Sequence, residues 1–231
     1  MSNKETLQSY NKNLGKNNET LASILNTINN LPEAGSGDGD NKLLASYIAT
    51  IDTSRGENIT IIPDGVTNIG AGKYQNKYDM KITKLPDTIQ TIGDTAFASC
   101  QQMAISKLPL LLVSAGKNAF SGCQSITELT AYENAVDFGQ YCFNCVNLKK
   151  ITFLASTVKL GNYCFTGATN ITAILMPNLT GVPNISTVAF TTSGITSNKG
   201  FVYVPDDLLE DIKTGISNYA NYFKGMSEYT E

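Results

Sequence analysis

The sequence predicts a repeat solenoid, mainly of β-structure, in which about six to seven leucine-rich-repeat-like coils are stacked with a period of 23. Glycines recur at this spacing, and an aromatic residue follows each glycine four positions later. The glycines are Gly70, Gly93, Gly116, Gly139 and, one position short of the period, Gly161; the aromatic residues are Tyr74, Phe97, Phe120, Phe143 and Phe165. Self-similarity at a fixed period between 20 and 50 residues indicates stacked supersecondary units rather than one globular core.

Each column of the repeat has a physical interpretation. We expect glycine to supply, where each coil turns, a backbone conformation that side chains forbid. The aromatic residues are expected to form a ladder inside the solenoid, each in contact with its neighbours one coil away. Proline stands seven positions before the first three glycines, at Pro63, Pro86 and Pro109, where it ends a strand because it lacks a backbone donor. A looser seventh unit runs from Val188 to Pro205.

One unit carries the pattern most fully, namely residues 85–109 with the sequence LPDTIQTIGDTAFASCQQMAISKLP. Its Ile-Gly-x-x-Ala-Phe-x-x-Cys core resembles the repeats of the BspA-like leucine-rich repeat family. The resemblance covers residues 59–205 of this chain. It implies a leucine-rich-repeat-like β-solenoid that attaches to surfaces or proteins, and it implies no reaction.

Composition and charge limit the classes of partner. The 231 residues include 17 Lys and Arg against 20 Asp and Glu, for a net charge of −3. This balance gives no electrostatic basis for binding nucleic acid or acidic membranes. The sequence contains no transmembrane stretch, and its polar start, residues 1–20, contains no apolar signal-peptide core.

The five cysteines fall into two columns of the repeat. Cys100, Cys123 and Cys145 follow the aromatic residue, and Cys142 and Cys164 precede it. Small, slightly apolar cysteine suits a tight core position, and free buried thiols fit folding in a reducing compartment. The C-x-x-C spacing of Cys142 and Cys145 could indicate redox chemistry or zinc, but the repeat explains both residues. We therefore predict no metal site and no cofactor.

The sequence also predicts no catalytic site and hence a protein that is not an enzyme. The chain has no histidine, which removes the usual general base and the commonest metal ligand. The neighbouring carboxylates of Asp206, Asp207, Glu210 and Asp211 lie in the first turns of a predicted helix, where they stabilise the helix dipole.

Residues 1–33 predict a coiled-coil-like helix that precedes the solenoid. Apolar or tolerated residues alternate at spacings of three and four, at Leu7, Tyr10, Leu14, Asn17, Leu21, Ile24, Ile28 and Leu31. This heptad pattern is typical of a coiled coil, in which Asn17 would fix the register. We expect the helix to form a trimer or to anchor the chain to a larger assembly. The alternative is a single amphipathic helix packed on its own solenoid.

The remaining boundaries follow from composition and helical spacing. Residues 34–41 (AGSGDGDN) predict a flexible linker. Residues 42–205 form the predicted solenoid, with a short capping helix over residues 42–51 that covers the first coil. Residues 206–231 predict a C-terminal capping helix with Asp206 as its N-cap. Both ends of the stack are therefore expected to be closed.

A candidate partner-binding surface follows from the outward positions of successive strands. One column holds Lys84, Lys107, Thr130, Thr152, Leu175 and Tyr203, and it is flanked by Glu128, Lys149 and Lys150. A row of lysine and threonine residues can bind an anionic glycan or a protein face. Equally, it can be a solvated sheet face whose lysines block association between sheet edges.

Two functions fit these features. The predicted function is that of a non-enzymatic bacteriophage virion protein of the tail, baseplate or head fibre, assembled in the host cytoplasm. Its N-terminal helix would bind other copies or virion proteins, and its solenoid would bind a host surface protein or glycan. The alternative, which the family resemblance favours, is a bacterial cell-surface adhesin or a protein-interaction scaffold.

Overall fold

The computed structural model describes residues 62–230. The chain divides into two compact units, Met1–Pro63 and Asp64–Glu231, and the second contains the repeats. The predicted heptad helix with its seam from Leu7 to Leu31, the linker and the capping helix over residues 42–51 all lie outside the described residues.

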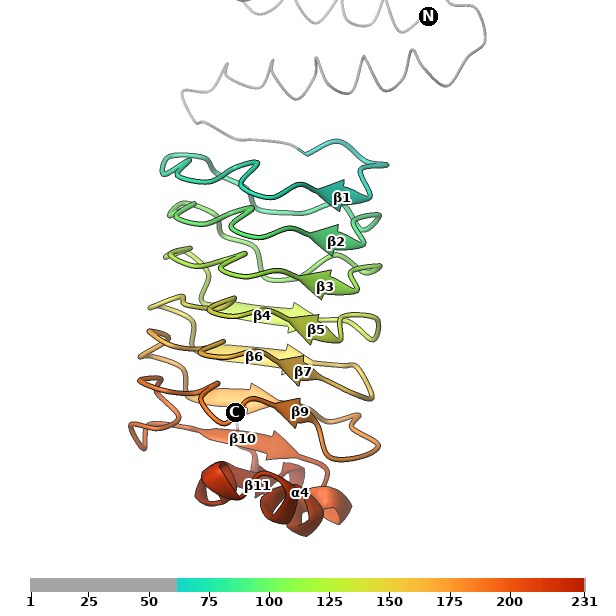
Figure 1. The fold of residues 1–231 in the computed structure, drawn as a ribbon, viewed down its shortest axis with the longest axis vertical. Helices are drawn as coiled ribbons and strands as arrows, with labels where there is room; N and C mark the ends of the chain where they lie inside the picture. The colour runs from blue at the N-terminus through green and yellow to red at the C-terminus, as the bar shows by residue number, and fades with distance from the viewer. Residues whose placement is uncertain (1–61, 231) are drawn as a thin grey trace, which may run out of the picture. The chain divides into compact units, whose positions relative to one another are not determined.

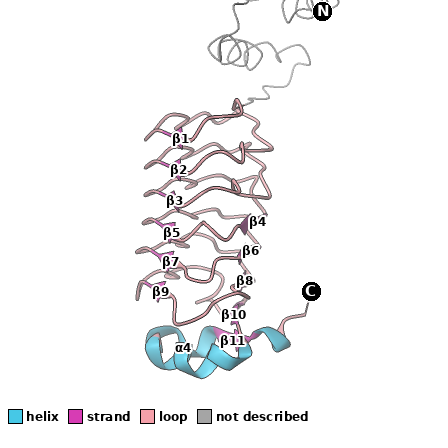
Figure 2. Ribbon diagram, turned by 90° about the vertical axis from the view of Figure 1, so that its right-hand side faces the viewer, coloured by secondary structure: helices cyan, strands magenta, loops and turns pink. Residues whose placement is uncertain are grey.

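The strands of successive coils form two parallel sheets, which lie on different sides of the solenoid (Figures 1 and 2). The six-stranded sheet has the order β1-β2-β3-β5-β7-β9, and the five-stranded sheet has the order β11-β10-β8-β6-β4. The six strands are β1 (Asn68–Ile69), β2 (Thr91–Ile92), β3 (Ser114–Ala115), β5 (Asp137–Phe138), β7 (Lys159–Leu160) and β9 (Asn184–Ile185). The five are β4 (Glu128–Ala131), β6 (Lys150–Phe153), β8 (Ala173–Leu175), β10 (Phe201–Val204) and β11 (Phe223–Gly225). The prediction of a mainly β repeat solenoid is therefore confirmed.

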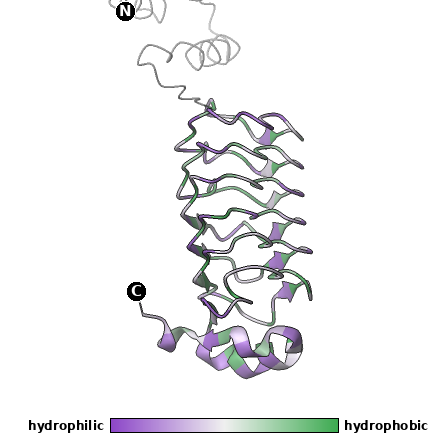
Figure 3. Ribbon diagram, turned by 90° about the vertical axis from the view of Figure 1, so that its left-hand side faces the viewer, coloured by the Kyte–Doolittle hydropathy of each residue, from purple (hydrophilic) through white to green (hydrophobic). Residues whose placement is uncertain are grey.

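Alternation along the short strands decides which residues enter the core. In β4 and β6 the second and fourth residues are buried, whereas the first and third are half-buried or exposed. Because successive strand residues point to opposite faces, equivalent residues of all coils form continuous inward and outward columns. Figure 3 shows that each coil carries both hydrophilic and hydrophobic stretches.

The predicted aromatic ladder runs through the core. Neighbouring rings from Tyr74 to Phe165 are stacked with centroids 5.3 to 5.9 Å apart. Phe190 continues the column 5.8 Å from Phe165. Such pairs stabilise a fold by about 0.5–1.5 kcal/mol beyond their area burial. The ladder therefore ties each coil to the next.

The glycine column has a different cause from the one predicted. These glycines do not adopt positive φ; from Gly93 onward, the preceding coil passes too close to allow a side chain. A Cβ on Gly139 would lie 2.6 Å from the carbonyl carbon of Gly116, and one on Gly93 would lie 2.6 Å from the backbone nitrogen of Ala71. The left-handed residues instead lie two positions after each glycine. They are Gly72, Thr95, Asn118, Tyr141 and Tyr163, with φ between 54° and 64°.

The coil that starts at Gly139 is one position shorter because a second left-handed residue is missing from its turn. In the neighbouring coils this position is occupied by Gly122 and Gly167, each with positive φ and each directly before the cysteine column. In the shorter coil only Asn144 separates Cys145 from Phe143, and the Cys145 backbone N–H donates directly to the Phe143 carbonyl at 2.8 Å. The shortened spacing is therefore a deletion within one turn.

The C-terminal segment closes the stack, but not as one helix. It forms η1 (Asp206–Leu208), α4 (Leu209–Gly215), η2 (Ser217–Tyr222), β11 and η3 (Met226–Glu228). Because β11 pairs in parallel with β10, the cap adds a further strand to the five-stranded sheet. Four of the apolar residues at helical spacing in this segment, Ile212, Ile216, Tyr219 and Phe223, are buried, although Phe223 lies in β11.

The predicted N-cap role of Asp206 is wrong. The residue that precedes η1 is Pro205, and no side chain caps this helix. The Asp206 carboxylate instead accepts hydrogen bonds from the Ser227 hydroxyl at 2.8 Å and from the Ser227 backbone N–H at 3.3 Å. Asp206 therefore holds η3 against the start of the cap.

Candidate functional site

One side of the five-stranded sheet points away from the core. This side, together with Lys107, which forms an isolated parallel bridge to Thr130 beside β4, is called the outward face. Parallel pairing aligns Lys107 with Thr130, Thr130 with Thr152, Thr152 with Leu175, and Leu175 with Tyr203. The predicted column from Lys107 to Tyr203 is therefore a physical row, with one residue per coil. Lys84, one period before Lys107, is exposed.

The part of the outward face between the first coil and β6 carries its exposed lysines. Lys84, Lys107 and Lys149 are exposed. Among residues 62–230, Lys107 and Lys149 form no ion pair, whereas Lys84 Nζ lies 3.8 Å from a carboxylate oxygen of Asp87. Lys150, which is half-buried, lies 3.5 Å from a carboxylate oxygen of Glu128 on the neighbouring strand.

The other end of the outward face is aromatic. The Tyr203 ring packs edge-on against Tyr229, with centroids 4.9 Å apart, and against Phe201, with centroids 6.4 Å apart. The Lys224 ammonium lies 4.3 Å from the centroid of Phe201. All three rings are half-buried. Leu175 belongs to the outward column and is only 8% exposed.

The sequence prediction included Tyr203 but missed its neighbours. Phe201 lies two positions before Tyr203 on the same strand, so the period of two along β10 was an available signal for its outward position. Lys224 was missed because residues 223–225 were expected to be helical, whereas β11 places Lys224 directly beside Tyr203. Nothing in the sequence pattern indicated that Tyr229 returns to this face.

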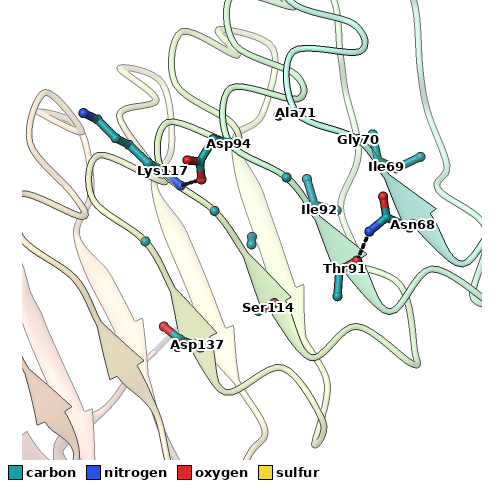
Figure 4. Close-up of a pocket in the computed structure, with 14 residues that line it drawn as sticks. Asn68, Ile69, Gly70, Ala71, Thr91, Ile92, Asp94, Ser114, Lys117 and Asp137 are labelled. Carbon is teal, nitrogen blue, oxygen red and sulfur yellow. Dashed lines mark hydrogen bonds between the residues drawn. The ribbon is translucent and has the colours of Figure 1, made fainter.

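The six-stranded sheet carries a separate feature, a shallow groove of about 580 Å³ over the glycine column (Figure 4). Gly70, Gly93, Gly116 and Gly139 are among its lining residues. Several polar side chains at its margin bond to the protein itself: the Asn68 amide donates to the Thr91 hydroxyl, and Asp94 accepts from the Lys117 backbone N–H at 2.7 Å. The groove is a consequence of the glycines that the coil spacing requires.

The cysteine columns are buried and have a structural role. All five thiols are free and buried. The thiols of Cys100, Cys123 and Cys145 donate to aromatic-column carbonyls of the preceding coil, at 3.1 to 3.2 Å. Burial raises the pKa of Cys100 to about 11 and that of Cys145 to about 12. These values disfavour the thiolate, which is the nucleophile and the metal ligand.

Metal binding and membrane insertion find no support among the described residues. Across residues 62–230, no group of three or more potential ligand side chains is placed to hold a metal ion. Within the same range, no helix is both long and apolar enough to cross a membrane.

Comparison with known proteins decides the family. Residues 67–196 match the BspA type leucine rich repeat region in six copies, which is more than half of the chain. The chain belongs to this family. The match confirms the resemblance inferred from the repeat columns. No curated protein matches the chain significantly.

Two solved structures are similar to this BspA-type protein. A leucine-rich repeat protein from Bacteroides ovatus is 26% identical with a TM-score of 0.47, and the match covers 66% of this chain and 40% of that one. A leucine rich cell surface protein from Faecalibacterium prausnitzii is 17% identical with a TM-score of 0.40, and the match covers 71% and 59% of the two chains. The chain therefore spans less than two thirds of either protein.

The family membership supports the alternative prediction, a bacterial adhesin or protein-interaction scaffold, better than the predicted virion protein. BspA-type repeats fit adhesion or protein interaction, and nothing in the comparisons indicates a bacteriophage virion protein. The family is a repeat scaffold, and neither the match nor the described residues give positive evidence of catalysis.

Proposed function

We propose that this BspA-type repeat protein is a non-catalytic binding module of the bacterial cell surface, which serves adhesion or protein interaction. Its partner binds on the outward face. The observation that carries the proposal is the in-register row from Lys107 to Lys224, because it joins exposed lysines at one end to an aromatic cluster at the other.

Protection of a sheet edge does not account for this face. Lysines on an edge strand prevent unwanted strand pairing, and this explains Lys107, which lies beyond β4 at the margin of the sheet. Phe201 and Tyr203 lie on β10, which is an interior strand between β8 and β11. Aromatic residues are enriched at binding interfaces, so a partner is the better explanation for their partial exposure.

This function can be tested by binding of the labelled full-length chain to an array of immobilised extracellular proteins and surface glycans. The variant Lys107→Ala/Tyr203→Ala removes one residue from each end of the row without changing a buried core position. The matched control, Thr91→Ala/Lys117→Ala, changes the side that carries the six-stranded sheet. Circular dichroism of all three proteins verifies the fold.

We expect the wild type and the control variant to bind the same array members. We expect Lys107→Ala/Tyr203→Ala to lose binding to these members. Loss of binding in the control variant alone would place the partner on the other sheet. Binding that neither variant reduces would remove the outward face from the function.

A further inference from the structure

We propose that the partner on the outward face is an acidic polypeptide segment that lies along the solenoid axis. Its carboxylates lie beside Lys107 and Lys149, and an apolar side chain lies beside Tyr203. This inference rests on the function proposed above and adds the chemical class of the partner.

The charges on the outward face are available to such a segment. Lys107 and Lys149 are exposed, and neither forms an ion pair with any residue between 62 and 230. The Lys84 side chain is 76% exposed, and its contact with Asp87 is a surface ion pair, which contributes little to stability. Glu128 is opposed by Lys150. Electrostatic complementarity therefore favours a partner that brings its own carboxylates.

The distance between the two ends sets the spacing of the partner's residues. Adjacent strands lie about 4.8 Å apart, so the four steps from Lys107 to Tyr203 span about 19 Å. An extended peptide covers about 3.3 Å per residue. The acidic residue beside Lys107 and the apolar residue beside Tyr203 are therefore separated by about six residues. Lys149 directly precedes β6, two strands from β10, so the acidic residue beside it lies closer to the apolar residue.

The aromatic end favours a polypeptide over an anionic polysaccharide. Tyr203 meets Tyr229 and Phe201 at interplanar angles of 67° and 70°, so the three rings do not form one flat platform on which sugar rings could stack. Beyond Lys149 and Lys150, the row continues with the uncharged Leu175 and Tyr203, so cations do not line its whole length. A chain of regularly spaced anionic sugars would instead require cations along its whole length.

Selection from a random dodecapeptide display library against the full-length chain tests this inference. The selected peptides are synthesised, and their affinities are measured by fluorescence anisotropy. Three variants are compared: Lys107→Glu/Lys149→Glu, Tyr203→Ala, and the control Lys73→Glu/Lys117→Glu. The control makes the same change in net charge with two exposed lysines outside the outward face. Heparin is measured in parallel as the anionic polysaccharide.

We expect the selected peptides to carry Asp or Glu about six residues from an aliphatic or aromatic residue. Lys107→Glu/Lys149→Glu should weaken their binding by about ten-fold or more, with a smaller loss in high salt. Tyr203→Ala should weaken it as well, and the control variant should not.

Three results would overturn the inference. The first is that the selected peptides bind Tyr203→Ala more weakly but bind Lys107→Glu/Lys149→Glu as tightly as the wild type. This result would keep the proposed function, with a different class of partner. The second is heparin binding that depends on Lys107 and Lys149 without any enrichment of acidic peptides, which would identify a polysaccharide site. The third is a selection that yields no binder, or only peptides whose affinity is the same for the wild type and for every variant of the outward face. This result would contradict the proposed function too.

Discussion

At the scale of single residues, the glycine column shows how closely the coils approach one another. A Cβ on Gly139 would lie 2.6 Å from the carbonyl carbon and 2.7 Å from the next backbone nitrogen of the preceding coil. These are backbone atoms, which cannot rotate away as a flexible side chain could. The column therefore fixes the spacing of the coils.

Replacement of one of these glycines by alanine tests the close approach. We expect Gly139→Ala to lower the free energy of unfolding by about 1–3 kcal/mol, because the coils must move apart. Gly70→Ala is the matched control, since a Cβ there would meet no atom within 4 Å. Urea titrations of both variants give the comparison, and equal midpoints for the two would contradict the explanation.

Ser193 occupies the last position of the cysteine column, and its buried hydroxyl is unpaired. It lies three positions after Phe190, as Cys123 lies three after Phe120, and its hydroxyl has no hydrogen-bond partner in the described part of the chain. We expect Ser193→Ala to raise the free energy of unfolding by about 1 kcal/mol, because an unpaired buried hydroxyl is costly. Thermal melts measure this change, and a lower melting temperature in the variant would show that the hydroxyl has a stabilising role.

The buried thiols predict a loss of stability at alkaline pH. Burial raises the pKa of Cys145 to about 12, whereas in the unfolded chain a thiol ionises near a pH of about 8.5. Between these values only the unfolded chain releases the proton, so the free energy of unfolding falls by about 1.4 kcal/mol per pH unit for this thiol.

Comparison with Cys145→Ala isolates this contribution from other groups that titrate at high pH. The alanine variant should be less stable than the wild type at neutral pH, but its stability should fall less steeply between about pH 9.5 and 10.5. Denaturant titrations across this range provide the data. Parallel pH profiles for the two proteins would show that Cys145 is not protected from ionisation.

At the scale of elements, the C-terminal cap continues the solenoid in two ways. β11 adds a strand to the five-stranded sheet, and Tyr219 ends the aromatic ladder with its ring centroid 4.9 Å from that of Phe190. The Tyr219 hydroxyl accepts a hydrogen bond from the Phe190 backbone N–H at 3.3 Å and donates one to the Thr187 carbonyl at 2.8 Å. The cap therefore satisfies backbone groups that the next coil would otherwise satisfy.

Removal of this hydroxyl tests the cap. We expect Tyr219→Phe to lower the free energy of unfolding by about 1–3 kcal/mol, because the buried Phe190 N–H loses its acceptor. Hydrogen exchange at Phe190 should accelerate in this variant. Tyr222→Phe is the control, since no hydrogen bond of the Tyr222 hydroxyl occurs within the described structure. Unchanged exchange at Phe190 would show that the cap does not depend on this contact.

Some of these elements can be predicted from the sequence alone, and others cannot. The period of 23 predicts the stack, the aromatic ladder and the outward row from Lys107 to Tyr203, because one column equals one position in every coil. It does not predict β11, since Ile212, Ile216 and Tyr219 continue a helical spacing into residues that tertiary pairing draws into the sheet. The true reason for the glycine column was also missed, because close approach between coils and a positive φ both select glycine.

At the scale of the whole molecule, the solenoid separates two surfaces of different character. The outward face carries exposed lysines and the aromatic cluster around Tyr203, whereas at the glycine groove on the six-stranded sheet Asn68, Thr91 and Asp94 are hydrogen-bonded within the protein. Because each coil repeats the same backbone, the differences between the two surfaces come from side chains outside the repeat consensus. The consensus therefore predicts the fold, and these variable positions hold the information about function.

Site-specific photo-crosslinking tests the central claim, that the partner binds on the outward face. A photoreactive phenylalanine analogue replaces Tyr203 in one protein and Thr91, on the six-stranded sheet, in another. Each protein is irradiated with the strongest binding member of the array. We predict a crosslinked product from position 203 and none from position 91. A product from position 91 with none from position 203 would contradict the account.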